Sequence, residues 1–228
     1  GGYGVSGQTL QIDSGVTLQG YGYLAQSSSA NLLNNGAVIA NTSGQTLSVG
    51  FTGISNNGSL RANAGTLQLT GLASNDGLLH VASGAIVSTG STALTNNAGG
   101  TVSGSGLLSV GSATFTNHGT LQPGGAGTVG TLSVTGNFVQ GASGNIAADV
   151  GPDANTHDVL AISGSANLNG TLNVAPLGSY LPVNNEQYGL LTYSGKVTGT
   201  FATINAPAFT GAAPDYDGAG TFFLRMPN

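Results

Sequence analysis

A short polar turn recurs through the first half of the chain at nearly constant spacing. Its first asparagine stands two positions after an apolar residue, and a glycine follows two positions later in four of the five copies. Successive copies are separated by 22, 19, 21 and 21 residues. The five asparagines are Asn34, Asn56, Asn75, Asn96 and Asn117. An even period of this length is typical of proteins built from stacked structural repeats.

Between the turns, short segments alternate apolar and polar residues. Residues 45–49, 65–69 and 107–110 are examples, and this period of two predicts half-buried strands. Strands this short cannot bury their apolar face in an isolated hairpin, but stacked windings bury it in a shared core. We therefore expect an all-β protein, a parallel β-helix (β-solenoid) with about 21 residues and three short strands in each coil.

The recurring asparagines have a structural role in such a fold. Asparagine tolerates the left-handed backbone conformations found at turns, and stacked asparagine side chains can hydrogen-bond from one coil to the next as a ladder. We therefore interpret the column from Asn34 to Asn117 as structural. A ligand-binding column stays open as the alternative.

The pattern divides the chain into two parts. Residues 1–139 are predicted to form solenoid repeats, and residues 140–228 to form the C-terminal solenoid coils and a cap. Residues 175–190 are bulkier and less regular, and residues 221–226 are a candidate closing strand. A cap is expected on physical grounds, because an uncovered last coil would expose strand edges that invite pairing.

The composition excludes several classes of structure and function. The chain has three Lys and Arg residues in total and a net charge of −5, which argues against exposed helices and against binding to nucleic acid or anionic lipid. It has no cysteine, so neither disulfides nor thiolate metal sites are possible. No apolar run approaches the ~20 residues of a membrane helix, and we expect no membrane insertion by this segment.

Three ordered blocks carry a resemblance to a known family. They are residues 119–139, with Gly-Thr-Leu-Gln-Pro-Gly and Gly-Asn-Phe, residues 157–174, with Gly-Thr-Leu-Asn-Val, and residues 188–201. In this order they resemble the C-terminal passenger region of autotransporter proteins and related haemagglutinin-like adhesins, over about residues 115–205.

The resemblance implies a right-handed parallel β-helix at the bacterial cell surface. In that family the last coils of the passenger help the rest of it to fold, and residues 140–228 match that autochaperone-like position. The sequence does not include the membrane barrel that follows such regions in the family, so the export route stays open.

Few residues suggest chemistry. Asp149, Asp153 and Asp158 form the main acidic cluster and are a weak candidate for a calcium site, with a polar surface loop as the simpler interpretation. The three histidines stand apart in sequence, and no nucleophile motif or phosphate-binding loop is present. We therefore predict no catalytic residues, no cofactor and no other metal site.

The favoured function is a non-catalytic, extracellular structural or adhesive segment of a bacterial surface protein. Its expected partners are surface polysaccharide or copies of itself. A self-assembling extracellular fibre subunit is the first alternative, and a polysaccharide-active β-helix enzyme is the second. An ice-binding solenoid is a weaker possibility, because the threonines do not recur in register.

Overall fold

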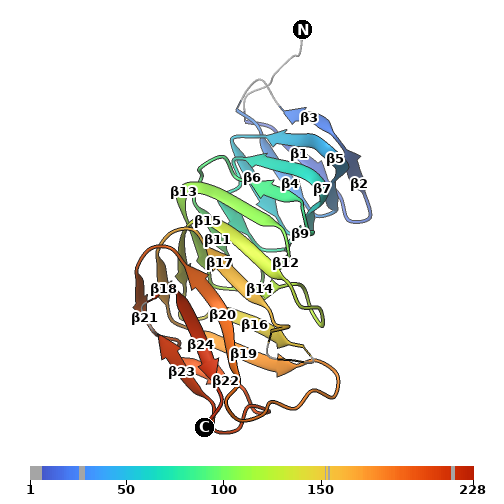
Figure 1. The fold of residues 1–228 in the computed structure, drawn as a ribbon. Helices are drawn as coiled ribbons and strands as arrows, with labels where there is room; N and C mark the ends of the chain where they lie inside the picture. The colour runs from blue at the N-terminus through green and yellow to red at the C-terminus, as the bar shows by residue number, and fades with distance from the viewer. Residues whose placement is uncertain (1–6, 26–28, 152, 154, 217–218) are drawn as a thin grey trace.

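The computed structural model describes residues 7–25, 29–151, 153, 155–216 and 219–228, and Figure 1 traces the chain through them. None of these residues is helical. The strands stack in parallel as a β-solenoid whose turns lie about 22 residues apart. The predicted all-β, parallel solenoid is therefore confirmed.

The strands are short in most coils, and the longer ones bend around a corner of the solenoid. In chain order they are β1 (Thr9–Ile12), β2 (Thr17–Gly20), β3 (Gly22–Ala25), β4 (Asn31–Asn34), β5 (Ala37–Gly50), β6 (Gly53–Asn56), β7 (Ser59–Thr70), β8 (Ser74–Asn75), β9 (Leu78–Val81), β10 (Ile86–Ser88), β11 (Leu94–Asn96), β12 (Thr101–Gly104), β13 (Leu107–Asn117), β14 (Thr120–Pro123), β15 (Thr131–Gln140), β16 (Asn145–Val150), β17 (Val159–Ile162), β18 (Ala166–Leu168), β19 (Thr171–Pro176), β20 (Gln187–Tyr193), β21 (Val197–Gly199), β22 (Thr203–Asn205), β23 (Ala213–Tyr216) and β24 (Thr221–Arg225).

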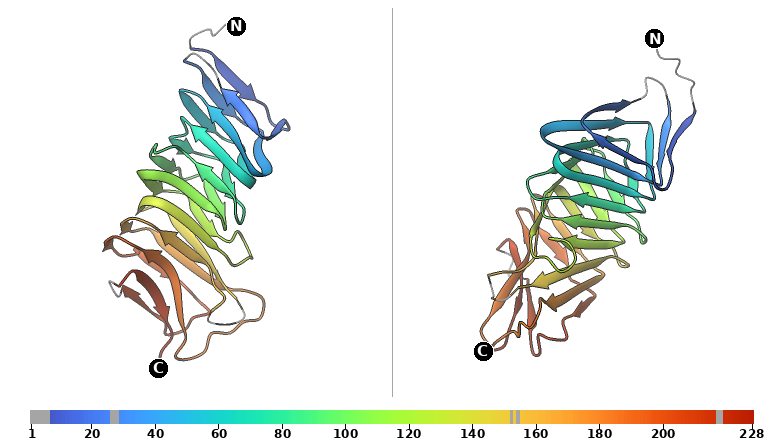
Figure 2. Two further views of the ribbon diagram at one scale, coloured as in Figure 1. Left: turned by 45° about the horizontal axis from the view of Figure 1, so that its top comes forward. Right: turned by 90° about the vertical axis from the view of Figure 1, so that its right-hand side faces the viewer.

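Three stacks of parallel strands form the walls of the solenoid (Figure 2). The first stack contains β1, β4, β6, β8, β11, β18 and β21, together with the second halves of β13 and β15. The second stack contains β2, β9, β12, β14, β16, β19 and β22, together with the first halves of β5 and β7. The third stack contains β3, β10, β17 and β20, together with the second halves of β5 and β7 and the first halves of β13 and β15.

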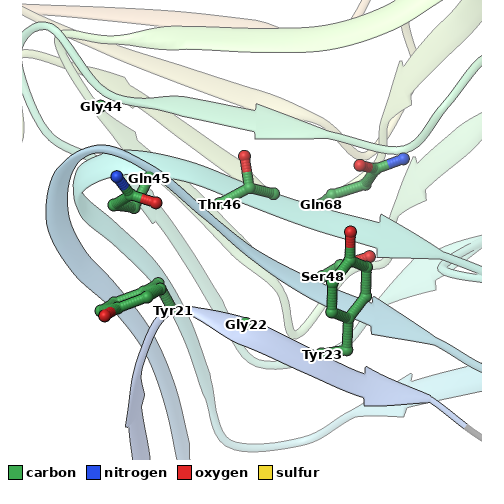
Figure 3. A pocket seen from close by; sticks show the side chains of 8 residues that line it. All are labelled: Tyr21, Gly22, Tyr23, Gly44, Gln45, Thr46, Ser48 and Gln68. Carbon is green, nitrogen blue, oxygen red and sulfur yellow. The ribbon is translucent and has the colours of Figure 1, made fainter.

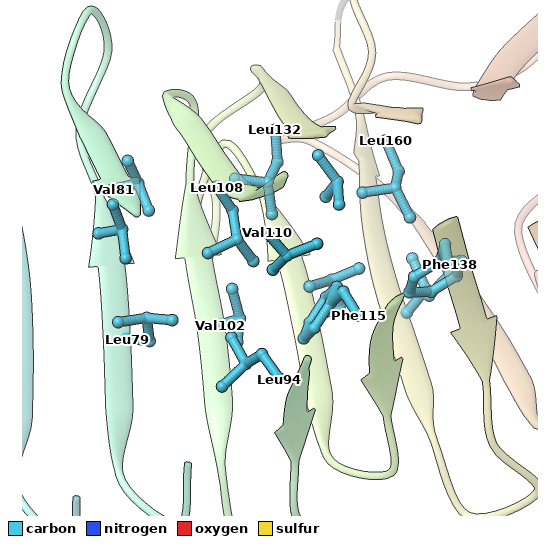
Figure 4. Packing of buried hydrophobic residues seen from close by; sticks show 14 of the residues in the cluster. Leu79, Val81, Leu94, Val102, Leu108, Val110, Phe115, Leu132, Phe138 and Leu160 are labelled. Atoms are coloured by element: carbon cyan, nitrogen blue, oxygen red, sulfur yellow. The ribbon is translucent and has the colours of Figure 1, made fainter. Parts of the chain in front are cut away.

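The core is a set of apolar columns that run along the solenoid axis. Alternate residues of a strand point to opposite faces, so residues in register on successive coils stack one above the other. One column contains Val38, Leu60, Leu79, Val102, Leu121 and Ile146, all buried. Figure 4 shows neighbouring columns, including Phe115 and Phe138, whose ring centroids lie 5.8 Å apart. Each apolar side chain thus packs on its counterparts in the adjacent coils.

The coil length is less uniform than the sequence repeat predicts. Hydrogen-bonded amide side chains on adjacent coils are 19 to 23 residues apart from Asn34 to Gln140. In the C-terminal coils the separation is larger, with 28 residues between Asn137 and Ser165 and 31 between Ser165 and Lys196. The period of about 21 residues therefore holds only for the N-terminal coils, because later coils carry longer loops.

The parallel stacking ends in an antiparallel cap, as expected. β24 pairs antiparallel with β20, and β23 pairs antiparallel with β24. Aromatic side chains close the core beneath these strands, with ring centroids 5.3 Å apart for both Tyr188–Phe209 and Phe201–Phe222. The outer strand β23 contains Pro214, which has no N–H to offer to a further strand. The outer edge of β23 is therefore a poor template for strand addition.

Candidate functional site

The five asparagines of the repeated turn form a continuous hydrogen-bonded ladder inside the solenoid. All five are fully buried, and in the first four the side-chain Nδ2 donates to the Oδ1 of the asparagine on the next coil. The donor–acceptor distances from Asn34 through to Asn117 are 2.7, 2.7, 2.8 and 2.8 Å. The structure thus brings all five predicted residues together, in a structural arrangement that leaves none of them exposed to a ligand.

The direction of the ladder is fixed by backbone carbonyls. Each Nδ2 also donates to a carbonyl oxygen of the following coil, for example from Asn56 to Leu78 at 3.2 Å and from Asn96 to Thr120 at 3.2 Å. A flipped amide would place oxygen against oxygen at these positions, so only one orientation satisfies both contacts. Every asparagine therefore joins its coil to both the side chain and the main chain of the next coil.

The ladder continues for one residue that sequence reasoning missed. Asn117 Nδ2 donates to Gln140 Oε1 at 3.0 Å, and Gln140 is 1% exposed. The signal was the apolar Phe138 two positions earlier, in the same place as Phe115 before Asn117. Among the described residues, Asn34 Oδ1 at one end and Gln140 Nε2 at the other have no hydrogen-bond partner. At its N-terminal end the ladder stops because Ile12 occupies the position in register with Asn34.

The three candidate calcium ligands hold backbone groups instead of converging on one point. Asp149 accepts a hydrogen bond from Gly127 N–H at 2.8 Å, and Asp153 accepts one from Asn155 N–H at 2.9 Å. Asp158 accepts one from Gly130 N–H at 2.8 Å and another from the backbone N–H of Asp149 at 2.9 Å. Within the described ranges, no three His, Cys, Asp or Glu side chains are grouped so that they could hold a metal ion.

Asp158 is an unusual carboxyl group, because it is only 1% exposed. Burial raises its pKa to about 7, and the nearby charge of Asp149 adds to the rise, while the two backbone N–H donors oppose it. Its two hydrogen bonds tie the glycine-rich loop at residues 124–130 to the next coil. The residue is therefore a structural link whose charge depends on pH.

The raised pKa of Asp158 predicts that stability falls as pH rises from about 4 to about 7. In that window the native state binds a proton that the unfolded chain has already released, so raising the pH favours unfolding. A shift from 3.8 to about 7 corresponds to ~4 kcal/mol at full ionisation. The side-chain carbon resonance of Asp158 should titrate with a midpoint near 7, and Asp158→Asn should remove this part of the pH dependence of the unfolding free energy. A midpoint near 4 would contradict the prediction.

A serine and a histidine meet on the outer side of the second stack. His80 Nδ1 lies 3.0 Å from Ser103 Oγ, and burial lowers the pKa of His80, with the charge of Arg61 adding to the effect. Nucleophilic catalysis by such a pair also needs a group that orients the histidine. Among the described residues, no carboxylate hydrogen-bonds to His80, and Ser103 is buried.

Two exposed tyrosines border a groove on the third stack (Figure 3). Tyr21 is 65% exposed and Tyr23 is 90% exposed, which is unusual for large aromatic side chains. Gly20 and Gly22, with φ of +122° and +113°, turn the chain on both sides of Tyr21. The groove, here called the tyrosine groove, has a volume of about 480 Å³ and is lined by Tyr21, Gly22, Tyr23, Gly44, Gln45, Thr46, Ser48 and Gln68.

The tyrosine groove has the chemistry of a site for an uncharged polar ligand. No Asp, Glu, Lys, Arg or His is among its lining residues. Amides and hydroxyls from β5 and β7 supply hydrogen-bond donors and acceptors, while the tyrosines add aromatic surface. Sequence reasoning did not identify this site, because the contributing residues are brought together only by the register of three coils.

No protein-family model matches the chain, and the search of curated proteins gave no match. None of the described residues belongs to a helix long and apolar enough to cross a membrane. The site must therefore be interpreted from its own geometry.

Proposed function

We propose that this chain is a non-catalytic structural and adhesive segment at a bacterial cell surface. The observation that carries the proposal is the tyrosine groove on a wall of a stacked rod, where Tyr23 is 90% exposed. Exposed tyrosines combine apolar area with a polar tip and are enriched at recognition surfaces. The resemblance of residues 115–205 to autotransporter passengers supports the same function and cellular location.

The solenoid is suited to hold such a surface away from the cell. Its core is continuous from Ile12 to Met226, and the buried asparagine ladder links the coils from Asn34 to Gln140. Close packing of this kind resists bending and local unfolding. The rod therefore supplies a rigid support on which an adhesive site keeps a fixed position.

Self-association is the second candidate, and the N-terminal end favours it. Leu10 is in register with the buried Leu32 and is 37% exposed, and no described strand pairs with the outer edge of β1, β2 or β3. At the other end, the antiparallel strand β24 covers β20, the last parallel strand of the third stack, so two copies would join through their N-terminal ends. Light scattering distinguishes the monomer from the dimer that this contact would form, and both from the long filaments that a fibre subunit would form.

Surface labelling tests the proposed location and role. Antibodies against the chain should label intact source cells without permeabilisation, and deletion of its coding region should reduce attachment of the cells to polysaccharide-coated surfaces. Purified chain should compete with the attachment of wild-type cells. Labelling only after permeabilisation, or unchanged attachment of the deletion strain, would refute the proposal.

A further inference from the structure

The tyrosine groove lies at one end of a longer polar column on the third stack. Residues in register on successive coils present outward side chains in one line along the rod axis. The column contains Tyr23, Ser48, Gln68, Ser88, Ser109 and Thr135. Thr135 Oγ1 donates to Ser109 Oγ at 3.0 Å, so neighbouring members of the column are close enough to share hydrogen bonds.

A second outward line runs beside this column, two residues earlier in each strand. It contains Thr46, Thr66, Ile86, Leu107, Ser133, Ala161 and Thr192. Its centre is apolar, with Ile86 and Leu107 half-buried. A second groove, of about 250 Å³, continues the same face at β13, β15, β17 and β20. The face therefore offers an apolar strip beside a line of hydroxyl and amide groups.

This combination matches the chemistry of a sugar chain. A pyranose ring has apolar C–H faces, which pack on aromatic and aliphatic surface, and a rim of hydroxyls, which exchange hydrogen bonds with hydroxyl and amide side chains. The two lines repeat at the strand spacing of about 4.8 Å, so similar groups recur along the axis for a ligand that also repeats. The face favours an extended, repetitive ligand over a compact one.

The absence of charge narrows the ligand class. Neither of the two lines contains an ionisable carboxylate, lysine, arginine or histidine. Recognition of uronate, sulfate or phosphate groups normally uses arginine or lysine, because an anion that leaves water needs compensating positive charge. By contrast, Lys196 lines the groove on the first stack, together with Asn167.

We infer that the third stack binds a linear, neutral polysaccharide that lies parallel to the solenoid axis, with its first sugar rings on Tyr21 and Tyr23 and its continuation along Ser88 and Ser109. The inference rests on the proposed adhesive function and names its ligand. Two exposed aromatic rings at the N-terminal end provide the anchor, and the polar column guides the remainder of the chain.

Titration with linear β-glucan oligosaccharides of increasing length tests this inference, with oligogalacturonates of equal length as the acidic comparison. Affinity for the glucans should rise with length. The NMR resonances of Tyr23 should respond to short oligosaccharides, and those of Ser88 and Ser109 only to longer ones. Tyr23→Ala should weaken binding by about tenfold or more, and Tyr23→Phe should change it much less because the ring remains. Asn167→Ala, in the groove that contains Lys196, is the control and should leave binding unchanged.

The results of these experiments distinguish a wrong ligand class from a wrong adhesive function. Equal or tighter binding of the oligogalacturonates, unchanged affinity of Tyr23→Ala, or no glucan binding would each overturn the inference. If glucans do not bind while intact cells are labelled and attachment still depends on the chain, the adhesive function stands and only the ligand class is wrong. If surface labelling fails as well, both proposals fall.

Discussion

Replacing Asn56 with alanine is expected to lower the free energy of unfolding by about 3 to 5 kcal/mol. The side chain is fully buried, donates to Asn75 at 2.7 Å and accepts from Asn34 at 2.7 Å. Its removal leaves Asn34 Nδ2 with the carbonyl oxygen of Ser59 as its remaining acceptor, and it leaves the side-chain oxygen of Asn75 without a donor. Each unmet buried group costs about 1–3 kcal/mol, and the lost volume adds a cavity. Chemical denaturation followed by circular dichroism measures the change.

The neighbouring residue provides a matched control for this prediction. Asn57 has the same side chain on the same turn but is exposed, with a single side-chain contact to Asn35 at 3.1 Å. Asn57→Ala should therefore change the unfolding free energy by no more than about 0.5 kcal/mol. Asn56→Asp keeps the shape of the side chain but removes its donors, and it should be at least as damaging as Asn56→Ala. Equal effects at positions 56 and 57 would show that the ladder does not stabilise the fold.

Gly100→Ala is expected to have an effect of similar size, of about 3 kcal/mol or more, because the added carbon has no space. A Cβ at Gly100 would lie 2.3 Å from Asn96 Oδ1 and 2.4 Å from the carbonyl oxygen of Asn75. Both atoms belong to the ladder or to its turn, and neither can move without breaking a hydrogen bond. The loss should appear as a lower unfolding midpoint.

Gly99 is the control for the effect at Gly100. The nearest atom to a Cβ at Gly99 is the carbonyl oxygen of Asp76 at 3.6 Å, which is an ordinary contact, and neither glycine has positive φ. Gly99→Ala should therefore be close to neutral in the same denaturation experiment. Similar destabilisation by the two substitutions would contradict the prediction, because it would show that the close approach to the ladder is not the cause of the loss.

The sequence repeat predicted the architecture because the same physical constraint acts on every coil. Inward positions must be apolar, and the turn must carry a buried amide with a glycine beside it. Where the repeat varies, the sequence pattern did not predict the residues that continue the ladder or the length of the turn. Gln140 replaces asparagine in the ladder, and Gly100 follows Asn96 by four residues, whereas Gly77 follows Asn75 by two. The register of β12 on β9, with Thr101 opposite Leu78, shows that the extra residues belong to the turn.

The candidate sites were harder to predict than the fold. The acidic residues near position 150 are close in sequence, which suggested a metal site, but each carboxylate accepts backbone N–H groups that sequence alone does not locate. The tyrosine groove was missed for the opposite reason. Its residues are far apart in sequence, from Tyr21 to Gln68, and become neighbours only through the pairing of β3 with β5 and of β5 with β7.

Cysteine cross-linking tests the stacking of the coils most directly, because the natural chain has no cysteine. Ser55 and Ser74 are in register on adjacent coils, and strands at a spacing of about 4.8 Å are within disulfide range. Oxidation of the Ser55→Cys, Ser74→Cys double variant should give an intramolecular disulfide in high yield. The Ser55→Cys, Thr116→Cys variant, whose cysteines lie three coils apart, should give none. Efficient cross-linking of the distant pair, or none of the adjacent pair, would contradict the solenoid.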